Sequence, residues 1–389
     1  MSELDLALRD PELPELALLL DDTALSAWLD SAVGASAVRR KYLRYKPGTA
    51  MVVTVSAGNE ELVVWHWAEP GRPKLEKLCR KAPEGSILYV DHAHRLVLSM
   101  PAADRHLPGL RALESGWLPD WVVLKPGPVT LKALSYKPRR RWVGSVACAG
   151  EPMALLRVYP PPELPRFVAA ARTLAGTGAP VPVLRGVDEA LGVAGFEWVP
   201  GAPLSLPASV GEYRALGEAL AELHGSGTGV GGLSVGQRIE DLRETLRLAS
   251  WLMPSLAGRL DAVGRVSVRS LAGRKGSATL HGDLSADQIV LGPDGSLNLI
   301  DLDRVRTGDP AEDFGCLGAS GLLQGLSGFE VLDEVVAGYG SAVDPWAVQA
   351  WTLYHLLVRS TDAFRACEPD WPQRLTRAVE LAEEMGQGL

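Results

Sequence analysis

"TLHGDLSADQIVL", residues 279–291, is the stretch of sequence that decides the fold. It places His281, Asp283, Asp287 and Gln288 in a short polar loop just before a strand. A second apolar run nearby, "LNLIDLDR" (297–304), brings two further carboxylates. The pattern is either an ordinary exposed polar loop or a site that holds a metal ion and phosphate groups.

The turn between these two runs decides how their polar groups are placed. Gly-Pro-Asp-Gly at 292–295 is a strong turn signal, so 289–291 and 297–300 are predicted to pair as an antiparallel hairpin. The start of its first strand then lies beside the end of its second, which makes Gln288 and Asp301 neighbours. Asp283, five residues before Gln288, can reach the same point. The potential ligands are then all oxygen atoms, and such a set favours Mg²⁺ over zinc. Polar groups that converge at the mouths of apolar strands favour a functional site over an exposed loop.

Composition places the chain among globular proteins of two or three domains. It has 389 residues, of which 47% are hydrophobic. No apolar run reaches the roughly 18–20 residues of a membrane span, and the acidic N-terminus is unlike a secretory signal. Four scattered cysteines without a CxxC pair are typical of reduced thiols, so we expect a cytoplasmic protein.

Acidic residues are concentrated in the second half of the chain. Residues 206–389 contain 25 Asp and Glu against 15 Lys and Arg, a net charge of −10, whereas the whole chain carries −8. This charge disfavours nucleic acid as a partner. It would suit Mg²⁺ or a cationic substrate, and solubility alone would explain it equally well.

Two segments of the first half resemble each other. Residues 42–67 and 133–159 each contain Tyr-Lys-Pro followed by β-rich runs on either side of a glycine-containing turn. The shared tyrosines, Tyr45 and Tyr136, are 91 residues apart, which indicates a degenerate internal duplication. Residues 206–389 are predicted to be mainly helical.

The loop motif resembles that of a known enzyme family. His281-Gly-Asp-Leu-x-x-x-Gln288, followed by Ile300-Asp-x-Asp303, resembles the signature of the aminoglycoside phosphotransferase/choline kinase-like family, relatives of protein kinases. "GFEWVPGAPL", "ALAELHGSG" and "RTGDPAEDFG" resemble its hinge, a helix ending in Leu-His, and the segment after the metal loop. The resemblance covers roughly residues 130–320 and implies a bilobed, α+β, protein-kinase-like fold. We therefore expect an additional α+β unit at 1–125, a small lobe and hinge at 126–205, and a helical large lobe at 206–389.

The resemblance implies a role for each polar group of the loop. Asp283 would orient the acceptor hydroxyl or accept its proton. Asp301 would bind Mg²⁺ that bridges the phosphates of ATP, and Gln288 would bind a second ion or orient Asp283. Asp303 would either assist the metal or support its ligands. The family usually has Asn at the position of Gln288, and Gln keeps the amide oxygen but reaches one methylene further.

The implied nucleotide site departs from the family pattern. The hinge residues that would offer backbone groups to adenine are Glu197, Trp198 and Val199. Arg157 stands where a phosphate-binding Lys is expected, and the helix predicted at 166–176 has no Glu to pair with it. Lys137 or the arginines at 139–141 therefore remain alternative phosphate contacts.

Three functions follow as hypotheses. The leading one is an ATP-dependent kinase that phosphorylates a hydroxyl of a small molecule, such as an aminoglycoside-like, sugar or amino-alcohol acceptor. The second is a peptide or protein Ser/Thr kinase of a ribosomal-peptide modification system, and the third is a non-catalytic relative that binds nucleotide or a partner protein. None needs nucleic acid or a membrane. The acceptor, the choice of ATP over GTP and the oligomeric state are left open.

Overall fold

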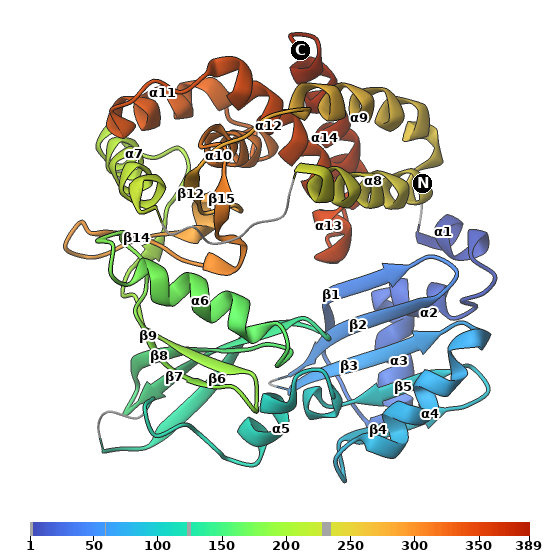
Figure 1. Cartoon of the computed structure of the whole chain (residues 1–389). Helices are drawn as coiled ribbons and strands as arrows, with labels where there is room; N and C mark the ends of the chain where they lie inside the picture. Colours follow the sequence, from blue (N-terminus) through green and yellow to red (C-terminus); the bar gives the residue numbers. More distant parts are fainter. Residues whose placement is uncertain (1–2, 59, 123–125, 228–234) are drawn as a thin grey trace. The chain divides into compact units, whose positions relative to one another are not determined.

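The computed structural model describes residues 3–58, 60–122, 126–227 and 235–389 (Figure 1). The chain forms two compact units. The first comprises residues 1–165, 185–195 and 362–371, and the second comprises 166–184, 196–361 and 372–389. The predicted α+β class, with a β-rich first half and a helical second half, is confirmed.

The first unit is built mainly from two five-stranded sheets. Its helices include α1 (Glu3–Arg9), α2 (Leu16–Leu20), α3 (Asp22–Val33), α4 (Arg72–Lys81), α5 (Pro108–Glu114) and α13 (Asp362–Arg365). The strands of the first sheet are β1 (Val38–Lys46), β2 (Ala50–Ala57), β3 (Glu60–Trp67), β4 (Ile87–Asp91) and β5 (Leu96–Ser99). Those of the second are β6 (Val129–Lys137), β7 (Arg141–Cys148), β8 (Glu151–Val158), β9 (Leu184–Asp188) and β10 (Val193–Glu197).

The two sheets have the same topology. Their strand orders are β1-β2-β3-β5-β4 and β6-β7-β8-β10-β9. In each sheet the fifth strand along the chain lies between the third and the fourth, and the fourth is at the edge. In each, a helix follows the third strand, α4 in one and α6 (Leu164–Leu174) in the other. Buried side chains of both sheets, with leucines of α4 and α5, form one hydrophobic core.

The repeated Tyr-Lys-Pro segments are held by the same contact. In the first sheet, Asp10 accepts hydrogen bonds from the Tyr45 hydroxyl at 2.7 Å and from the Gly48 amide at 2.8 Å. In the second, Asp104 accepts from the Tyr136 hydroxyl at 3.0 Å and from the Arg139 amide at 2.5 Å. Both amides belong to residues with a φ of 64°, so the two turns also share their backbone conformation.

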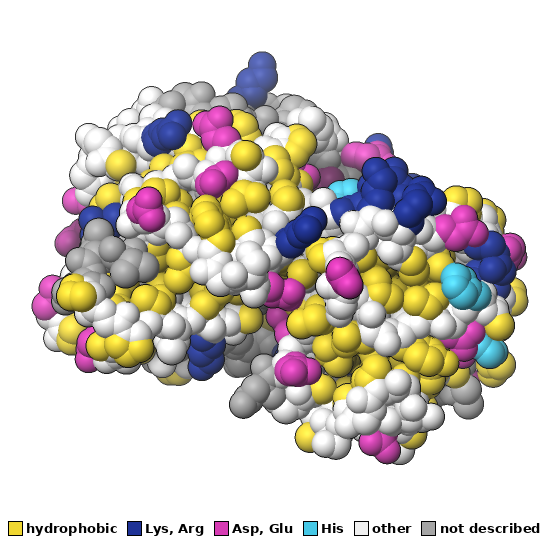
Figure 2. Space-filling model, turned by 90° about the horizontal axis from the view of Figure 1, so that it is seen from below, with side chains coloured by type: hydrophobic (Ala, Val, Ile, Leu, Met, Phe, Trp, Pro, Cys, Tyr) yellow, Lys and Arg dark blue, Asp and Glu magenta, His cyan; other side chains and the backbone are white. Residues whose placement is uncertain are grey.

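The surface of the molecule mixes apolar and charged side chains. On the face in Figure 2, hydrophobic side chains are widely exposed between separate charged ones, with one group of Lys and Arg gathered together. Part of the exposed apolar surface comes from the edge strand β6, where Leu131 and Leu134 face solvent. Lys132 between them is also exposed, as is common on strands at the edge of a sheet.

The second unit is mostly helical and carries a small hairpin. Its helices include α7 (Val210–Gly225), α8 (Val235–Leu252), α9 (Ala257–Leu271), α10 (Ala311–Leu323), α11 (Gly328–Tyr339), α12 (Pro345–Arg359) and most of α14 (Trp371–Gly386). Its short strands are β11 (Ala202–Pro203), β12 (Ala278–Leu280), β13 (Ile289–Leu291), β14 (Leu297–Leu299) and β15 (Arg306–Gly308). Helix α7 begins with a capping box formed by Ser209 and Glu212.

Helix α10 packs closely on α12. A Cβ atom at Gly315 would lie 2.5 Å from the Cβ of Trp351, so glycine allows the two backbones to approach. This contact matters because α10 supplies Asp313 and α12 supplies Arg359 to the loop described below. Among the helices that the structure describes, none is long and apolar enough to cross a membrane.

Candidate phosphotransfer site

The loop at 281–288 lies between β12 and β13 and is anchored by apolar residues. Strand β12 pairs with β15, and β13 pairs with β14. Leu280, Leu284 and Ile289 are fully buried, so they fix the backbone from which the polar side chains project. The predicted hairpin forms, with Ile289 opposite Leu299 and the Gly292 amide donating to the Ser296 carbonyl at 2.7 Å.

The hairpin brings Gln288 and Asp301 to the same end, as the sequence predicted. The Ile300 amide donates to the Gln288 carbonyl at 2.9 Å. The Gln288 side chain donates its NH₂ group to Asp287 at 2.9 Å, which leaves the amide oxygen as the end that suits a metal. Asp301 has a left-handed backbone, with φ 63° and ψ 53°, a conformation that aspartate tolerates better than most residues.

The Asp283 carboxylate lies between two arginines. Its Oδ1 accepts a hydrogen bond from Nη2 of Arg359 at 2.8 Å, and its Oδ2 lies 3.4 Å from Nε of Arg304. The side chain remains 39% exposed. Burial tends to raise the pKa of Asp283, but the charges of Arg304 and Arg359 outweigh burial and hold this pKa below its ordinary value. Asp283 is therefore an ionised hydrogen-bond acceptor.

Asp313 on α10 fixes the backbone of the loop. Its two oxygens accept the amides of His281 and Gly282 at 2.7 and 2.8 Å, and His224 of α7 lies 3.0 Å from Oδ2. Burial favours a raised pKa, yet the hydrogen bond and charge of His224 hold the pKa of Asp313 far below its usual value. His281 also bonds to the Ile300 carbonyl through Nε2 at 2.7 Å, so it has a structural place in the loop.

A buried network of two arginines and one glutamate supports the backbone of the loop. Glu312 is fully buried and accepts hydrogen bonds from both Arg238 and Arg306. Arg306 also donates to the Gly282 carbonyl at 3.2 Å, which ties the network to the loop backbone. The Arg238 guanidinium lies over the Trp351 ring, 4.9 Å from its centroid.

Asp309, directly after β15, joins this segment of the chain to α12. Its carboxylate accepts from Trp351 Nε1 and from Arg274, both at 3.1 Å. The amide of Ala311 donates to the other oxygen, also at 3.1 Å. Asp309 and Asp313 thus fasten loops to helices.

Gly282 is expected to tolerate no side chain. Its φ is +81°, and a Cβ there would overlap the Arg306 guanidinium and the Arg304 carbonyl. Gly282→Ala should lower the melting temperature, measured by thermal unfolding, because it displaces Arg306 from the loop. Gly295→Ala is the matched control: its φ is +82°, but nothing lies within 4 Å of its Cβ position. Equal losses of melting temperature in the two variants would show that backbone strain alone is responsible.

The predicted metal ligands offer oxygen donors of the right kind. Asp301 precedes the short turn that follows β14, Asp303 lies within that turn, and Gln288 lies beside Asp301. Within the described parts of the chain, no group of three or more His, Cys, Asp or Glu side chains is placed to hold a metal. Such a group is not needed for Mg²⁺, which protein sites commonly bind through one or two carboxylates plus substrate phosphates. The residues present therefore fit Mg²⁺ delivered with a nucleotide.

The residues predicted to bind nucleotide lie in both units. Arg157 belongs to β8 in the first unit, is almost completely buried, and has Nη1 3.4 Å from the Tyr159 hydroxyl. The chain passes from the first unit to the second between Gly195 and Phe196, within the predicted hinge. The Glu197 amide donates to the Val183 carbonyl at 2.8 Å. Contact with adenine would therefore use other backbone groups of Glu197, Trp198 and Val199.

Arg304 and Arg359 were not among the residues predicted from the sequence. Arg304 is the last residue of the quoted run "LNLIDLDR", so its position next to the carboxylates in the sequence could have indicated that it belongs to the site. Arg359 is 76 residues from Asp283, at the end of α12. Nothing local in the sequence connects it with the loop.

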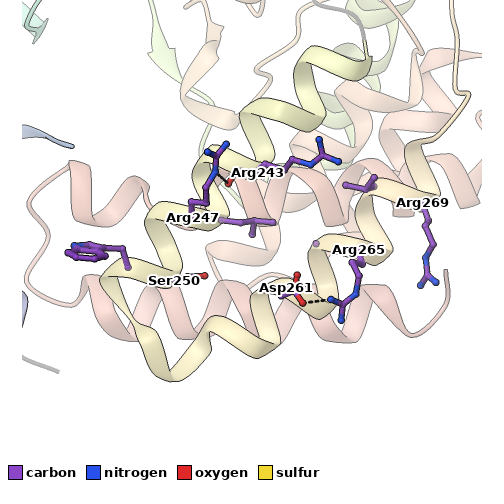
Figure 3. A pocket seen from close by; sticks show the side chains of 10 residues that line it. Arg243, Arg247, Ser250, Asp261, Arg265 and Arg269 are labelled. Carbon is purple, nitrogen blue, oxygen red and sulfur yellow. Dashed lines mark hydrogen bonds and ion pairs between the residues drawn. The ribbon is translucent and has the colours of Figure 1, made fainter. Parts of the chain in front are cut away.

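A hollow of about 820 Å³ lies along α8 and α9, away from every predicted site residue (Figure 3). Figure 3 shows Arg243 and Arg247 on α8 and Arg265 on α9. Glu240 pairs with the two arginines of α8, and Asp261 pairs with Arg265. Since these exposed arginines have partners on their own helices, we regard this face as a solvated helix pair.

Comparisons with known proteins agree on one family. A sequence profile described as the phosphotransferase enzyme family matches residues 136–352, more than half of the chain. No curated protein sequence matches closely enough to count as a relative.

Similar solved structures share the fold. A choline/ethanolamine kinase family protein from Mesorhizobium loti is 19% identical with a TM-score of 0.53, covering 72% of this chain and 94% of that one. A choline kinase from Streptococcus pneumoniae is 16% identical with a TM-score of 0.52, covering 66% and 93%. A choline kinase from Cryptosporidium parvum is 11% identical with a TM-score of 0.52, covering 72% and 95%. At these identities the likeness concerns the fold.

Proposed function

Because the chain belongs to the phosphotransferase enzyme family, we propose that it transfers the γ-phosphate of ATP to a hydroxyl of a small molecule. The observation that carries the proposal is the hairpin that sets Gln288 beside Asp301, next to a loop that presents the ionised Asp283. Phosphoryl transfer depends on positioning and charge neutralisation, and these side chains supply both.

Asp283 acts on the acceptor in this proposal. It accepts a hydrogen bond from the acceptor hydroxyl and so aligns its oxygen with the γ-phosphorus. As the new oxygen–phosphorus bond forms, the bond from the γ-phosphorus to ADP breaks, and the hydroxyl proton passes to Asp283 or to solvent. The lowered pKa of Asp283 suits a residue that orients the hydroxyl and takes the proton late.

The residues around Asp301 would hold Mg²⁺ with the nucleotide. Asp301 and the Gln288 amide oxygen would be direct ligands, with Asp303 beside them. When bound, the ion supplies positive charge that neutralises the phosphates during transfer. The left-handed backbone of Asp301 turns the chain at this point and leads directly into the segment that carries Asp303 and Arg304.

The first sheet is proposed to be a degenerate copy of the small lobe that does not bind nucleotide. The strand registers make Trp65 the counterpart of Arg157. Each lies on the third strand of its sheet, one residue before the position that aligns, across the second strand, with the repeated tyrosine. Trp65 is buried and donates Nε1–H to the Ser99 hydroxyl at 2.9 Å. An indole at this position offers no charge to phosphate, so the copy keeps the fold without the cation.

Nucleotide binding is expected to raise the melting temperature of the protein. At a concentration of 100 times Kd, a ligand that binds only the folded state adds about 2.7 kcal/mol. For a unit of this size that corresponds to about 5 °C or more. The Mg²⁺-dependent part of the shift should disappear in Asp301→Asn and persist in Asp261→Asn, a carboxylate on the exposed face of α9. No shift with ATP or GTP, with or without Mg²⁺, would refute the proposed function.

Turnover then separates an enzyme from a non-catalytic relative. Arg157 in place of Lys, together with the absence of any acidic residue from α6, is the observation that favours nucleotide binding without transfer. A protein that binds MgATP but releases no ADP with any hydroxyl compound would support that second function.

A further inference from the structure

Two guanidinium groups flank the proposed catalytic carboxylate. Arg359 donates to one oxygen of Asp283 at 2.8 Å, and Arg304 lies 3.4 Å from the other. A single carboxylate carries one negative charge, whereas the two arginines carry two positive charges between them. These two arginines therefore carry more positive charge than the carboxylate that they share can neutralise.

The two arginines are held differently. Arg359 is the last residue of α12, and its side chain is only 19% exposed, with Nη2 also 3.2 Å from Cys316 Sγ. Arg304 ends the short turn after Asp301, and its side chain is 58% exposed. The Arg359 guanidinium is thus largely enclosed by protein, whereas that of Arg304 extends from the proposed metal loop toward solvent.

The other acidic residues near the loop have roles of their own, and the proposed Mg²⁺ ion would balance the charges of Asp301 and Asp303. Glu312 is committed to Arg238 and Arg306, and Asp313 is committed to His224 and two loop amides. His355, one turn before Arg359, is buried, and burial holds its pKa well below the ordinary value.

We propose that the acceptor carries an anionic group, a carboxylate or a phosphate, which Arg304 and Arg359 bind while Asp283 orients its hydroxyl. This inference rests on the proposed function and names the class of substrate for the same site. Arginine binds carboxylate and phosphate through paired, charge-assisted hydrogen bonds. An ammonium group placed there would be repelled by both guanidinium groups, at short range and without full screening.

Local charge outweighs the net charge of the second half of the chain. The excess of acidic residues at 206–389 was compatible with a cationic acceptor, but salt screens exposed charges beyond about 8 Å. Arg304 and Arg359 lie within 3.4 Å of the Asp283 oxygens, so they act directly on any group bound there.

The test compares small alcohols that differ mainly in charge. Glycerate, glycerol and 2-amino-1,3-propanediol form one set, and gluconate, glucose and glucosamine form another. ADP release from MgATP is measured with each compound for the wild-type protein, Arg359→Gln and Arg304→Gln. Arg265→Gln, on the exposed face of α9, is the matched control.

We expect only the anionic member of each set to change ADP release, either as an acceptor or as a competitive inhibitor. Its apparent affinity should fall about 10- to 100-fold in Arg359→Gln and in Arg304→Gln, and Arg359→Lys should recover part of it. Arg265→Gln should match wild type. If Arg359→Gln does not fold, Arg304→Gln still provides the test, because Arg304 is exposed.

Several results would overturn this inference. The inference fails if the cationic or neutral compounds change ADP release as much as the anion does, or if neither anion changes it. It also fails if the effect of the anion is the same in both arginine variants as in the wild-type protein. Loss of the ATP-induced melting shift in Arg359→Gln would instead assign the arginines to the nucleotide phosphates, which also overturns it. Failure of the wild-type protein to bind any nucleotide refutes the proposed function itself.

Discussion

Replacement of Asp283 by asparagine is expected to lower ADP release from MgATP by about 100- to 10,000-fold, the usual contribution of a positioned acid–base group. Asparagine keeps the size of the side chain but accepts no proton and carries no charge. Arg304 and Arg359 would then lack their shared carboxylate, so the geometry of the acceptor site should also loosen. Steady-state turnover with MgATP measures the effect.

Binding of nucleotide separates loss of chemistry from loss of structure. The ATP-induced rise in melting temperature should persist in Asp283→Asn, because this residue is not among the proposed metal or nucleotide ligands. Asp294→Asn is a suitable control, since its carboxylate only caps the exposed hairpin turn through Ser296. Turnover by Asp283→Asn at the wild-type rate would remove Asp283 from the mechanism.

Replacement of Glu312 by glutamine is expected to destabilise the second unit by about 3–5 kcal/mol, the typical cost of breaking a buried ion pair. Arg238 and Arg306 are both nearly inaccessible to water and would keep their charges without the carboxylate. For a unit of roughly this size, the melting temperature should fall by about 6 °C or more. Because Arg306 also holds the Gly282 carbonyl, turnover of MgATP should fall with it.

An exposed ion pair provides the comparison. Glu383 binds Arg259 through two hydrogen bonds of 2.7 and 2.6 Å, but both side chains are more than one-third exposed. Glu383→Gln should therefore cost no more than about 1 kcal/mol. A fall in melting temperature as large for Glu383→Gln as for Glu312→Gln would contradict the importance assigned to burial.

Local patterns predicted much of the large-lobe site. The turn at 292–295, with apolar runs on either side, was sufficient to predict the hairpin and the neighbourhood of Gln288 and Asp301. Such a hairpin is predictable because its register follows from the turn and from alternation along short strands. The shared Tyr-Lys-Pro likewise indicated a repeat, and both copies have the same strand order.

The roles of buried charged residues were not predictable from sequence. Glu312 and Arg238 are 74 residues apart, and their contact depends on how α8 and α10 both pack against α12. The Asp104–Tyr136 contact also has no local signal, because the carboxylate and the phenol belong to different parts of the fold.

By itself, the sequence determined the repeated β-rich segments, the mainly helical second half, the hairpin and the identity of the polar groups at its end. Only the tertiary structure decided which charges meet them. Arg359 reaches Asp283 because α10 and α12 pack closely at Gly315 and carry the end of α12 to the loop. Charge pairing depends on distances of a few ångströms between residues far apart in the chain, and packing sets those distances.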